Sequence, residues 1–132
     1  SDRIQILKGE TEDQIYFSTK HGKIKISSDI HVYIDEELRM FCEVKDYMDS
    51  TMLKRFLFEC ENIINIHRNC ITMIVQFENA LGDDSIKLSK DKVDSVLTLT
   101  HNKRNSGKIR TPINNYSQFR ELCDSVCLAI GS

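Results

Sequence analysis

The residues with the most versatile chemistry in this sequence are cysteine and histidine, and they occur at two suggestive spacings. His67 and Cys70 are separated by two residues. Cys123 and Cys127 are separated by three, so their thiols would lie one turn apart on a helix. These two cysteines also continue an apolar stripe on the predicted last helix, where a cysteine commonly acts as a small core residue. We therefore predict that the sequence has no metal site and no bound cofactor.

The usual local signatures of catalysis are missing from the sequence. It has no Gly-x-Ser-x-Gly, no His-Glu-x-x-His and no glycine-rich phosphate loop, and its five glycines leave little room for such a loop. A cysteine nucleophile needs a nearby base, whereas four of the five cysteines lie on predicted apolar faces. We therefore predict that the chain is not an enzyme and has no catalytic residues.

A basic segment near the C-terminus is the strongest candidate for binding a charged ligand. Residues 87–110 carry seven basic and two acidic side chains, whereas residues 29–49 carry two basic and seven acidic ones. The Asn-Ser-Gly sequence at 105–107 predicts the tip of a hairpin, and Lys23 and Lys25 on an earlier strand could extend its charge. Such a patch would recognise the phosphates of nucleic acid or of a phosphoinositide, which is our alternative function. The cations that flank the turn are Lys103, Arg104, Lys108 and Arg110.

One aromatic residue stands apart from the apolar face of the predicted helix over residues 50–64. On a helical wheel Phe58 falls beside Lys54 and Arg55, on the side that should meet water. A large aromatic there is either covered by a loop of the same chain or exposed as an anchor for a partner. Because aromatic and arginine side chains are enriched at interface hot spots, we take Phe58, Arg55 and Lys54 as candidate partner-binding residues.

Alternating apolar and polar residues predict β-strands in the first third of the sequence. The same period returns at residues 71–77 and resumes through Ile86, Leu88, Leu97, Leu99 and Ile109, so we expect further strands there. The early predicted strands cover residues 14–17, 23–26, 30–34 and 38–44.

Helical spacing of apolar residues predicts one internal helix over residues 50–64 and an amphipathic helix that closes the chain. In the closing helix, Leu122 and Val126 should lie in the core. The predicted fold class is therefore α+β, an antiparallel sheet or partly open barrel with these two helices. This order resembles the outline of pleckstrin-homology-like domains, and residues 80–113 resemble the strand pattern of a sliding-clamp subunit. Both are likenesses of fold outline and imply no function.

Length and composition indicate one globular domain spanning residues 1–132. The sequence is 40% hydrophobic and 29% charged, and none of its apolar runs approaches the roughly 20 residues needed to span a membrane. Five cysteines without paired spacing indicate reduced thiols and an intracellular location, cytoplasmic or nuclear. From these features we expect a non-enzymatic protein–protein interaction module of a larger assembly, able to associate with itself into a homo-oligomer.

Overall fold

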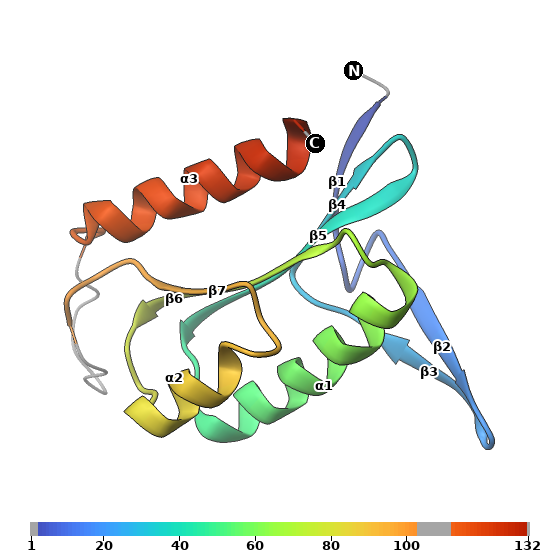
Figure 1. Cartoon of the computed structure of the whole chain (residues 1–132), viewed down its shortest axis with the longest axis horizontal. Helices are drawn as coiled ribbons and strands as arrows, with labels where there is room; N and C mark the ends of the chain where they lie inside the picture. Colours follow the sequence, from blue (N-terminus) through green and yellow to red (C-terminus); the bar gives the residue numbers. More distant parts are fainter. Residues whose placement is uncertain (1–2, 103–111, 132) are drawn as a thin grey trace.

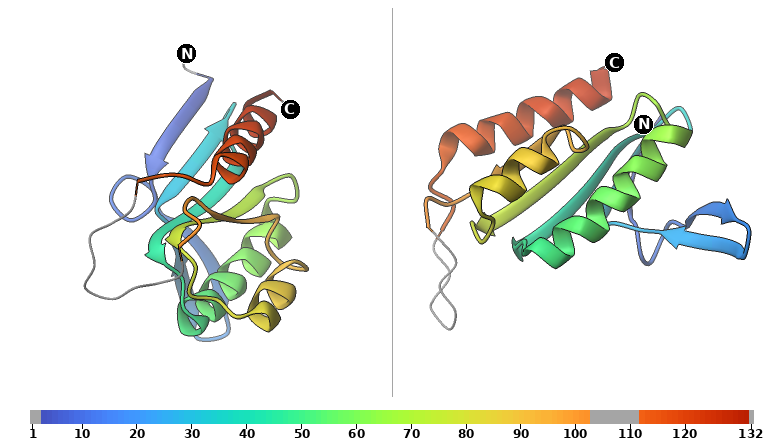
Figure 2. Two further views of the ribbon diagram at one scale, coloured as in Figure 1. Left: turned by 90° about the vertical axis from the view of Figure 1, so that its left-hand side faces the viewer. Right: turned by 60° about the horizontal axis from the view of Figure 1, so that its bottom comes forward.

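The computed structural model describes residues 3–102 and 112–131, which fold around a five-stranded sheet (Figure 1). In spatial order its strands are β1 (Ile4–Lys8), β4 (Ile30–Ile34), β5 (Glu37–Tyr47), β6 (Ile71–Glu78) and β7 (Ser95–Thr98). A separate two-stranded ribbon consists of β2 (Ile15–Thr19) and β3 (Gly22–Ile26). The helices are α1 (Ser50–Ile66), α2 (Asp83–Ser89) and α3 (Tyr116–Gly131). Figure 2 shows α1 and α2 on one face of the sheet and α3 on the other.

The direction of each strand follows from the connection that precedes it. Asp35 and Glu36 join β4 to β5 in a tight turn, both with positive φ, 51° and 69°, so these strands are antiparallel. Parallel neighbours need a longer crossover, and α1 supplies it between β5 and β6 as α2 does between β6 and β7. The chain moves in the same direction across the sheet from β5 to β6 and from β6 to β7. Crossover connections of this kind share one handedness, so both helices lie on the same face of the sheet.

Helix α1 confirms the internal helix predicted from the sequence. The side chain of Asp49 accepts a hydrogen bond from the backbone N–H of Met52 at 2.8 Å, which caps the N-terminus. At the other end, the N–H of His67 donates to the carbonyl of Ile63 at 2.7 Å. The buried face consists of Leu53, Phe56, Leu57, Cys60 and Ile63.

The sheet buries a separate apolar cluster on each of its faces. The first lies under α1, where the rings of Phe41 and Phe56 stack with their centroids 5.6 Å apart. The second lies under α3 and includes Ala129 of that helix. Because successive residues of a strand point to opposite faces, β5 contributes Phe41 to the first cluster and Met40 and Cys42 to the second. Strand β5 is therefore the central element of the fold.

The α+β class is confirmed, but two features of the predicted architecture are not. The sheet is mixed rather than antiparallel, it is not closed into a barrel in the part described, and the pleckstrin-homology-like outline is not confirmed. Two helices rather than one lie between strands, because α2 occupies the region of Ile86 and Leu88 where a strand was expected. Asp83 and Asp84 lie in the first turn of α2, where negative charge favours a helix N-terminus. The hairpin predicted at 105–107 lies outside the described residues.

Helix α3 closes the fold as predicted, but it buries less of its apolar surface than expected. Leu122 and Val126 are half-buried against the second cluster, and Ala129 is the one fully buried residue of the helix. Cys123 and Cys127 are exposed, so the prediction that they are core residues is wrong. A helix that rests on a sheet covers only the side facing the sheet, and the apolar stripe of α3 is wider than that side. Across residues 3–102 and 112–131, no helix is both long and apolar enough to cross a membrane.

Candidate active site

Two carboxyl groups, one just before β4 and one within β5, meet beside α1, and we call them the carboxylate pair. Asp29 immediately precedes β4, and Glu43 lies within β5. The register pairs Ile30 with Cys42, which places Asp29 opposite Glu43. The Oδ2 atom of Asp29 accepts a hydrogen bond from the backbone N–H of Val44 at 2.8 Å, and the two carboxyl groups are hydrogen-bonded to each other. The pair is therefore positioned by the sheet itself.

An irregularity in the β4–β5 pairing creates this contact. The register shifts by one residue between Val32 and Tyr33, so Arg39 is an extra residue on β5. A shift of one residue exchanges the two faces of a strand. With regular pairing from the turn onward, Asp29 would lie opposite Cys42, and Glu43 would point to the other face.

Burial makes the carboxylate pair electrostatically unusual. Glu43 is only 4% exposed, and burial together with the hydrogen bond and charge of Asp29 raises the pKa of Glu43 to about 8. The positive charge of Lys45 opposes this shift, and the Nη2 atom of Arg55 on α1 lies 4.0 Å from the Oε2 atom of Glu43. At pH 7 the pair therefore retains a proton on Glu43 that an exposed glutamate would lose.

Further acids extend from the carboxylate pair toward the surface. Burial raises the pKa of Glu59 on α1 to about 7. The positive charge of Arg55 opposes this shift, and the negative charge of Glu10 adds to it. The Oε2 atom of Glu59 is buried and accepts no hydrogen bond. Glu10 and Asp29 line a surface hollow of about 150 Å³. Lys8 and Thr11 complete the lining of this hollow, so its charge is mixed, and Glu59 is not one of its lining residues.

One lysine lies close enough to affect the carboxylate pair. Lys45 is two residues beyond Glu43 on β5, so both side chains leave the same face of the strand. It is half-buried, and its charge lowers the pKa of Glu43. The neighbouring residue on β6 is Gln76, whose side chain accepts a hydrogen bond from the N–H of Met48 and donates one to Thr98, each 3.0 Å long. These two hydrogen bonds fix the position of the chain just after Lys45.

The chemistry available to the carboxylate pair is that of a hard cation site. Mg²⁺ is typically held by one or two carboxylates, with waters and substrate phosphates completing its coordination. Within the described ranges, no three or more His, Cys, Asp or Glu side chains are arranged for a metal ion. Asp29 and Glu43 therefore fit an open site that shares its ion with substrate, and they do not fit a closed structural zinc site.

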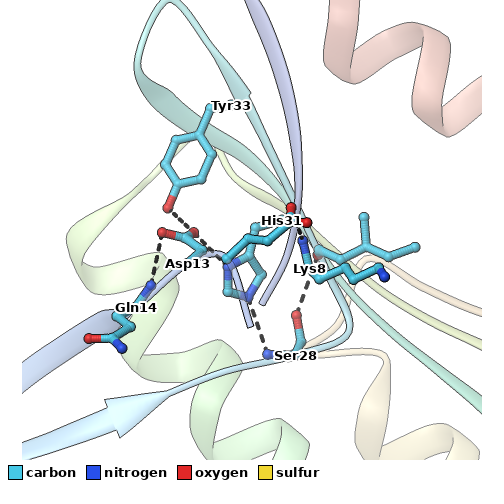
Figure 3. Close-up of polar contacts among 8 residues, drawn as sticks. Lys8, Asp13, Gln14, Ser28, His31 and Tyr33 are labelled. Atoms are coloured by element: carbon cyan, nitrogen blue, oxygen red, sulfur yellow. Dashed lines mark hydrogen bonds and ion pairs between the residues drawn. The ribbon is translucent and has the colours of Figure 1, made fainter. Parts of the chain in front are cut away.

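A buried histidine ties together the segments that flank Asp29 (Figure 3). His31 is fully buried, with its Nδ1 atom 2.7 Å from Oδ2 of Asp13 and its Nε2 atom accepting a hydrogen bond from the N–H of Ser28 at 3.2 Å. Because Nε2 accepts, the ring is neutral and Nδ1 donates to Asp13, which also accepts from the Tyr33 hydroxyl. Burial lowers the pKa of His31 although Asp13 opposes the shift, which agrees with a neutral ring.

The loop after β1 packs tightly against the same histidine. A side chain at Gly9 would place its Cβ atom 1.9 Å from the carbonyl oxygen of Ser28 and 2.5 Å from Nε2 of His31. The N–H of Gly9 also donates to the carbonyl of Asp29 at 3.2 Å. Glycine at this position therefore lets the loop approach the backbone that carries Asp29.

The structure keeps two of the three residues predicted to bind a partner together, Phe58 and Lys54, and directs Arg55 elsewhere. Phe58 is 52% exposed, and the edge of its ring packs on Phe17 of the β2–β3 ribbon, with centroids 6.0 Å apart. Lys54 is exposed and lines a hollow of about 250 Å³ with Phe58, whereas Arg55 reaches toward Glu43. A partner-binding role for these residues stays a prediction. The predicted anion-binding residues Lys103, Arg104, Lys108 and Arg110 lie outside the described residues.

The sequence reasoning missed Asp29, Glu43 and Lys45, although one signal was present. Glu43 is an acid inside the apolar run from Met40 to Val44, within a predicted strand. Acids are almost never fully buried unless they are paired, so an acid in that position indicates a function or a partner. Its partner is 14 positions earlier in the sequence, and no local motif connects the two.

No protein-family model and no curated protein sequence matches this chain. Among solved structures, it is similar to a chain of the native BbvCI A2B2 tetramer, with a TM-score of 0.58 and 14% sequence identity. The match covers 96% of this chain and 57% of that chain, so this chain spans little more than half the length of its structural neighbour. At this identity the likeness concerns the fold alone.

Proposed function

We propose that this chain hydrolyses phosphodiester bonds of nucleic acid, using a divalent metal ion held by Asp29 and Glu43. The observation that carries the proposal is the contact between these two carboxyl groups, with Lys45 beside them. Burial of two adjacent acids disfavours their charges, so the pair retains a proton at pH 7, and a divalent cation could take the place of that proton. The proposal departs from the sequence prediction that the chain is not an enzyme.

Each of the three side chains has a distinct role in the proposed reaction. Asp29 and Glu43 would hold a Mg²⁺ ion, which would supply Lewis acidity to the phosphate and to water. Lys45 would donate a hydrogen bond to the phosphate oxygens on which negative charge develops. A water oxygen bonds to phosphorus while the bond from phosphorus to the leaving oxygen breaks; the water releases a proton to solvent, and the leaving oxygen takes one up from solvent. The products are a phosphate monoester and an alcohol.

A phosphodiester fits this site better than an uncharged substrate. Mg²⁺ held by two carboxylates completes its coordination with substrate phosphates, and Lys45 offers a further positive charge to the same anion. Nucleic acid is a polyanion whose binding depends on lysine and arginine side chains. The ribbon that leads into Asp29 carries Lys20, Lys23 and Lys25, which supports a polymeric phosphodiester over a small one.

Hydrolysis assays with and without Mg²⁺ or Mn²⁺ test the proposal. The substrates are a labelled DNA duplex and the small diester bis(p-nitrophenyl) phosphate. We expect metal-dependent cleavage of both, reduced about 100-fold or more in Asp29→Asn and in Glu43→Gln, since each loses a metal ligand. Lys45→Ala should lower the rate while leaving metal affinity nearly unchanged.

Glu37→Gln is the matched control, because it makes the same chemical change at an exposed position of the same strand. Its activity should equal that of the wild type. Absence of metal-dependent hydrolysis by the folded wild-type chain contradicts the proposal, as does full activity of Glu43→Gln.

A second function, binding of a protein partner or of another copy of the chain, is favoured by the exposed apolar side chains of α3. Tyr116 is 73% exposed, Leu128 65% and Phe119 41%. The structural neighbour is a chain of an A2B2 tetramer, so we propose self-association through α3 as the alternative. Light scattering over a range of concentrations tests it, and a monomer at every concentration would exclude it.

We keep the intracellular location, cytoplasmic or nuclear, as a proposal. It is supported by the cysteines, all five of which are free thiols. Expression of a tagged chain in cells, followed by fractionation, tests it.

A further inference from the structure

The β2–β3 ribbon has a cationic face that contributes none of the three side chains of the proposed reaction. The strands pair Tyr16 with Lys25 and Ser18 with Lys23, so these four side chains share one face, which we call the cationic face. All four are exposed. Residues 14–26 contain three lysines, the third being Lys20 at the turn, and neither aspartate nor glutamate. In Figure 1 and in the right-hand view of Figure 2 the ribbon projects from the body of the fold.

The opposite face of the ribbon fixes its orientation. Ile15 pairs with Ile26, and both are buried in the first apolar cluster. Further along, Phe17 is half-buried and packs against Phe58 of α1. Because the apolar face of the ribbon turns toward α1, the cationic face turns outward to solvent.

The base of the ribbon joins the candidate active site directly. Strand β3 ends at Ile26, three residues before Asp29. Asp13, which precedes β2, and Ser28, which follows β3, are both hydrogen-bonded to His31. The buried histidine thus holds the two ends of the ribbon at a fixed position relative to Asp29. A polyanion lying along the cationic face would be led toward the carboxylate pair.

We propose that the β2–β3 ribbon is a duplex-DNA-binding arm that presents DNA to the carboxylate pair. Its lysines contact phosphates, and Tyr16 and Ser18 lie along the groove. A two-stranded ribbon fits the major groove of B-form DNA, which is about 12 Å wide, whereas the major groove of duplex RNA is too narrow and deep. Five paired residues span about 17 Å, enough to cross that groove. The presentation to the active site rests on the proposed function, whereas the binding itself does not.

Binding is tested without metal, in EDTA, so that hydrolysis plays no part. Fluorescence anisotropy of a labelled DNA duplex is measured over a series of salt concentrations. Removing two phosphate contacts in Lys23→Gln/Lys25→Gln should lower the slope of log affinity against log salt by about two. Arg68→Gln/Arg120→Gln is the control, because it removes two exposed cations that lie outside the ribbon, the candidate site and the basic segment 87–110. The control should keep the wild-type slope.

Equal slopes for the wild type and the ribbon variant overturn the proposal, as does an equal loss in the control. A duplex RNA of the same sequence that competes as well as DNA also overturns it, because the ribbon would then not be reading the DNA groove. Both variants should keep the wild-type unfolding midpoint, since exposed charges contribute little to stability.

Hydrolysis of bis(p-nitrophenyl) phosphate separates this proposal from the proposed function. That diester is too small to reach the ribbon, so the ribbon variant should cleave it at the wild-type rate and cleave the DNA duplex more slowly. If the wild type hydrolyses neither substrate but the ribbon variant loses DNA binding, the proposed function fails and the binding arm stands. If the small diester is cleaved and the ribbon variant binds DNA like the wild type, the binding arm fails and the proposed function stands.

Discussion

Replacing Glu43 with glutamine should change how the stability of the fold depends on pH. The pKa of Glu43 is about 8 in the folded chain, whereas the ordinary value is 4.5, because burial and Asp29 disfavour its charge. Between these values the folded state holds a proton that the unfolded state has released, so stability falls as pH rises. Glutamine keeps the shape of the side chain and has no such proton.

The size of the effect follows from the same two values. Each pH unit across this window costs about 1.4 kcal/mol. The wild type should therefore lose about 4 to 5 kcal/mol relative to Glu43→Gln between pH 4.5 and 8, and little more above pH 8. Groups that face Glu43 and can moderate this loss are Asp29, Lys45, Arg55 and Glu59.

Urea unfolding at a series of pH values, in EDTA, measures the difference between the two proteins. Glu37→Gln serves as the control and should follow the wild type, because Glu37 is exposed. Mg²⁺ at about 100 times its Kd for the wild type should then restore about 2.7 kcal/mol to the wild type and much less to Glu43→Gln, which has lost one of the two ligands. Parallel pH profiles for the wild type and Glu43→Gln would refute the electrostatic reasoning, and equal effects of Mg²⁺ would refute the metal assignment.

Two further substitutions test the packing around the site and the ribbon. Gly9→Ala should destabilise the fold by about 2 kcal/mol or more in urea unfolding, since its Cβ atom would meet the Ser28 carbonyl at 1.9 Å. Gly82→Ala is the control and should cost far less, because nothing lies within 4 Å of the Cβ atom there. Similar unfolding midpoints for the two variants would contradict this prediction. Phe58→Ala should cost the isolated chain about 1 kcal/mol through the lost Phe17 contact. If Phe58 is also a partner anchor, light scattering should show self-association weakened by about 2 kcal/mol or more.

The sequence predicted the elements that have strong local signals. It failed where the spacing of apolar residues fits a strand as well as a short helix. Helix α1 combines an apolar face with the capping residue Asp49, and it was predicted nearly to its bounds. In α2, Ile86 and Leu88 are two residues apart, which fits a strand, but in a short helix that spacing carries little information. The parallel pairing of β5 with β6 depends on the path of α1 across the sheet, and local alternation of residues does not encode it.

Local sequence patterns could not predict the candidate site, and the reason is specific to the pairing of β4 with β5. From the turn at Asp35 and Glu36, regular pairing of β4 with β5 places Asp29 opposite Cys42, with Glu43 on the other face of the sheet. The extra residue Arg39 reverses that assignment and brings the two acids together. Bulges are found preferentially near functional sites because they re-aim a side chain without changing the strand order. A buried acid flanked by apolar neighbours should therefore be tested against both registers of its partner strand before it is assigned to a face.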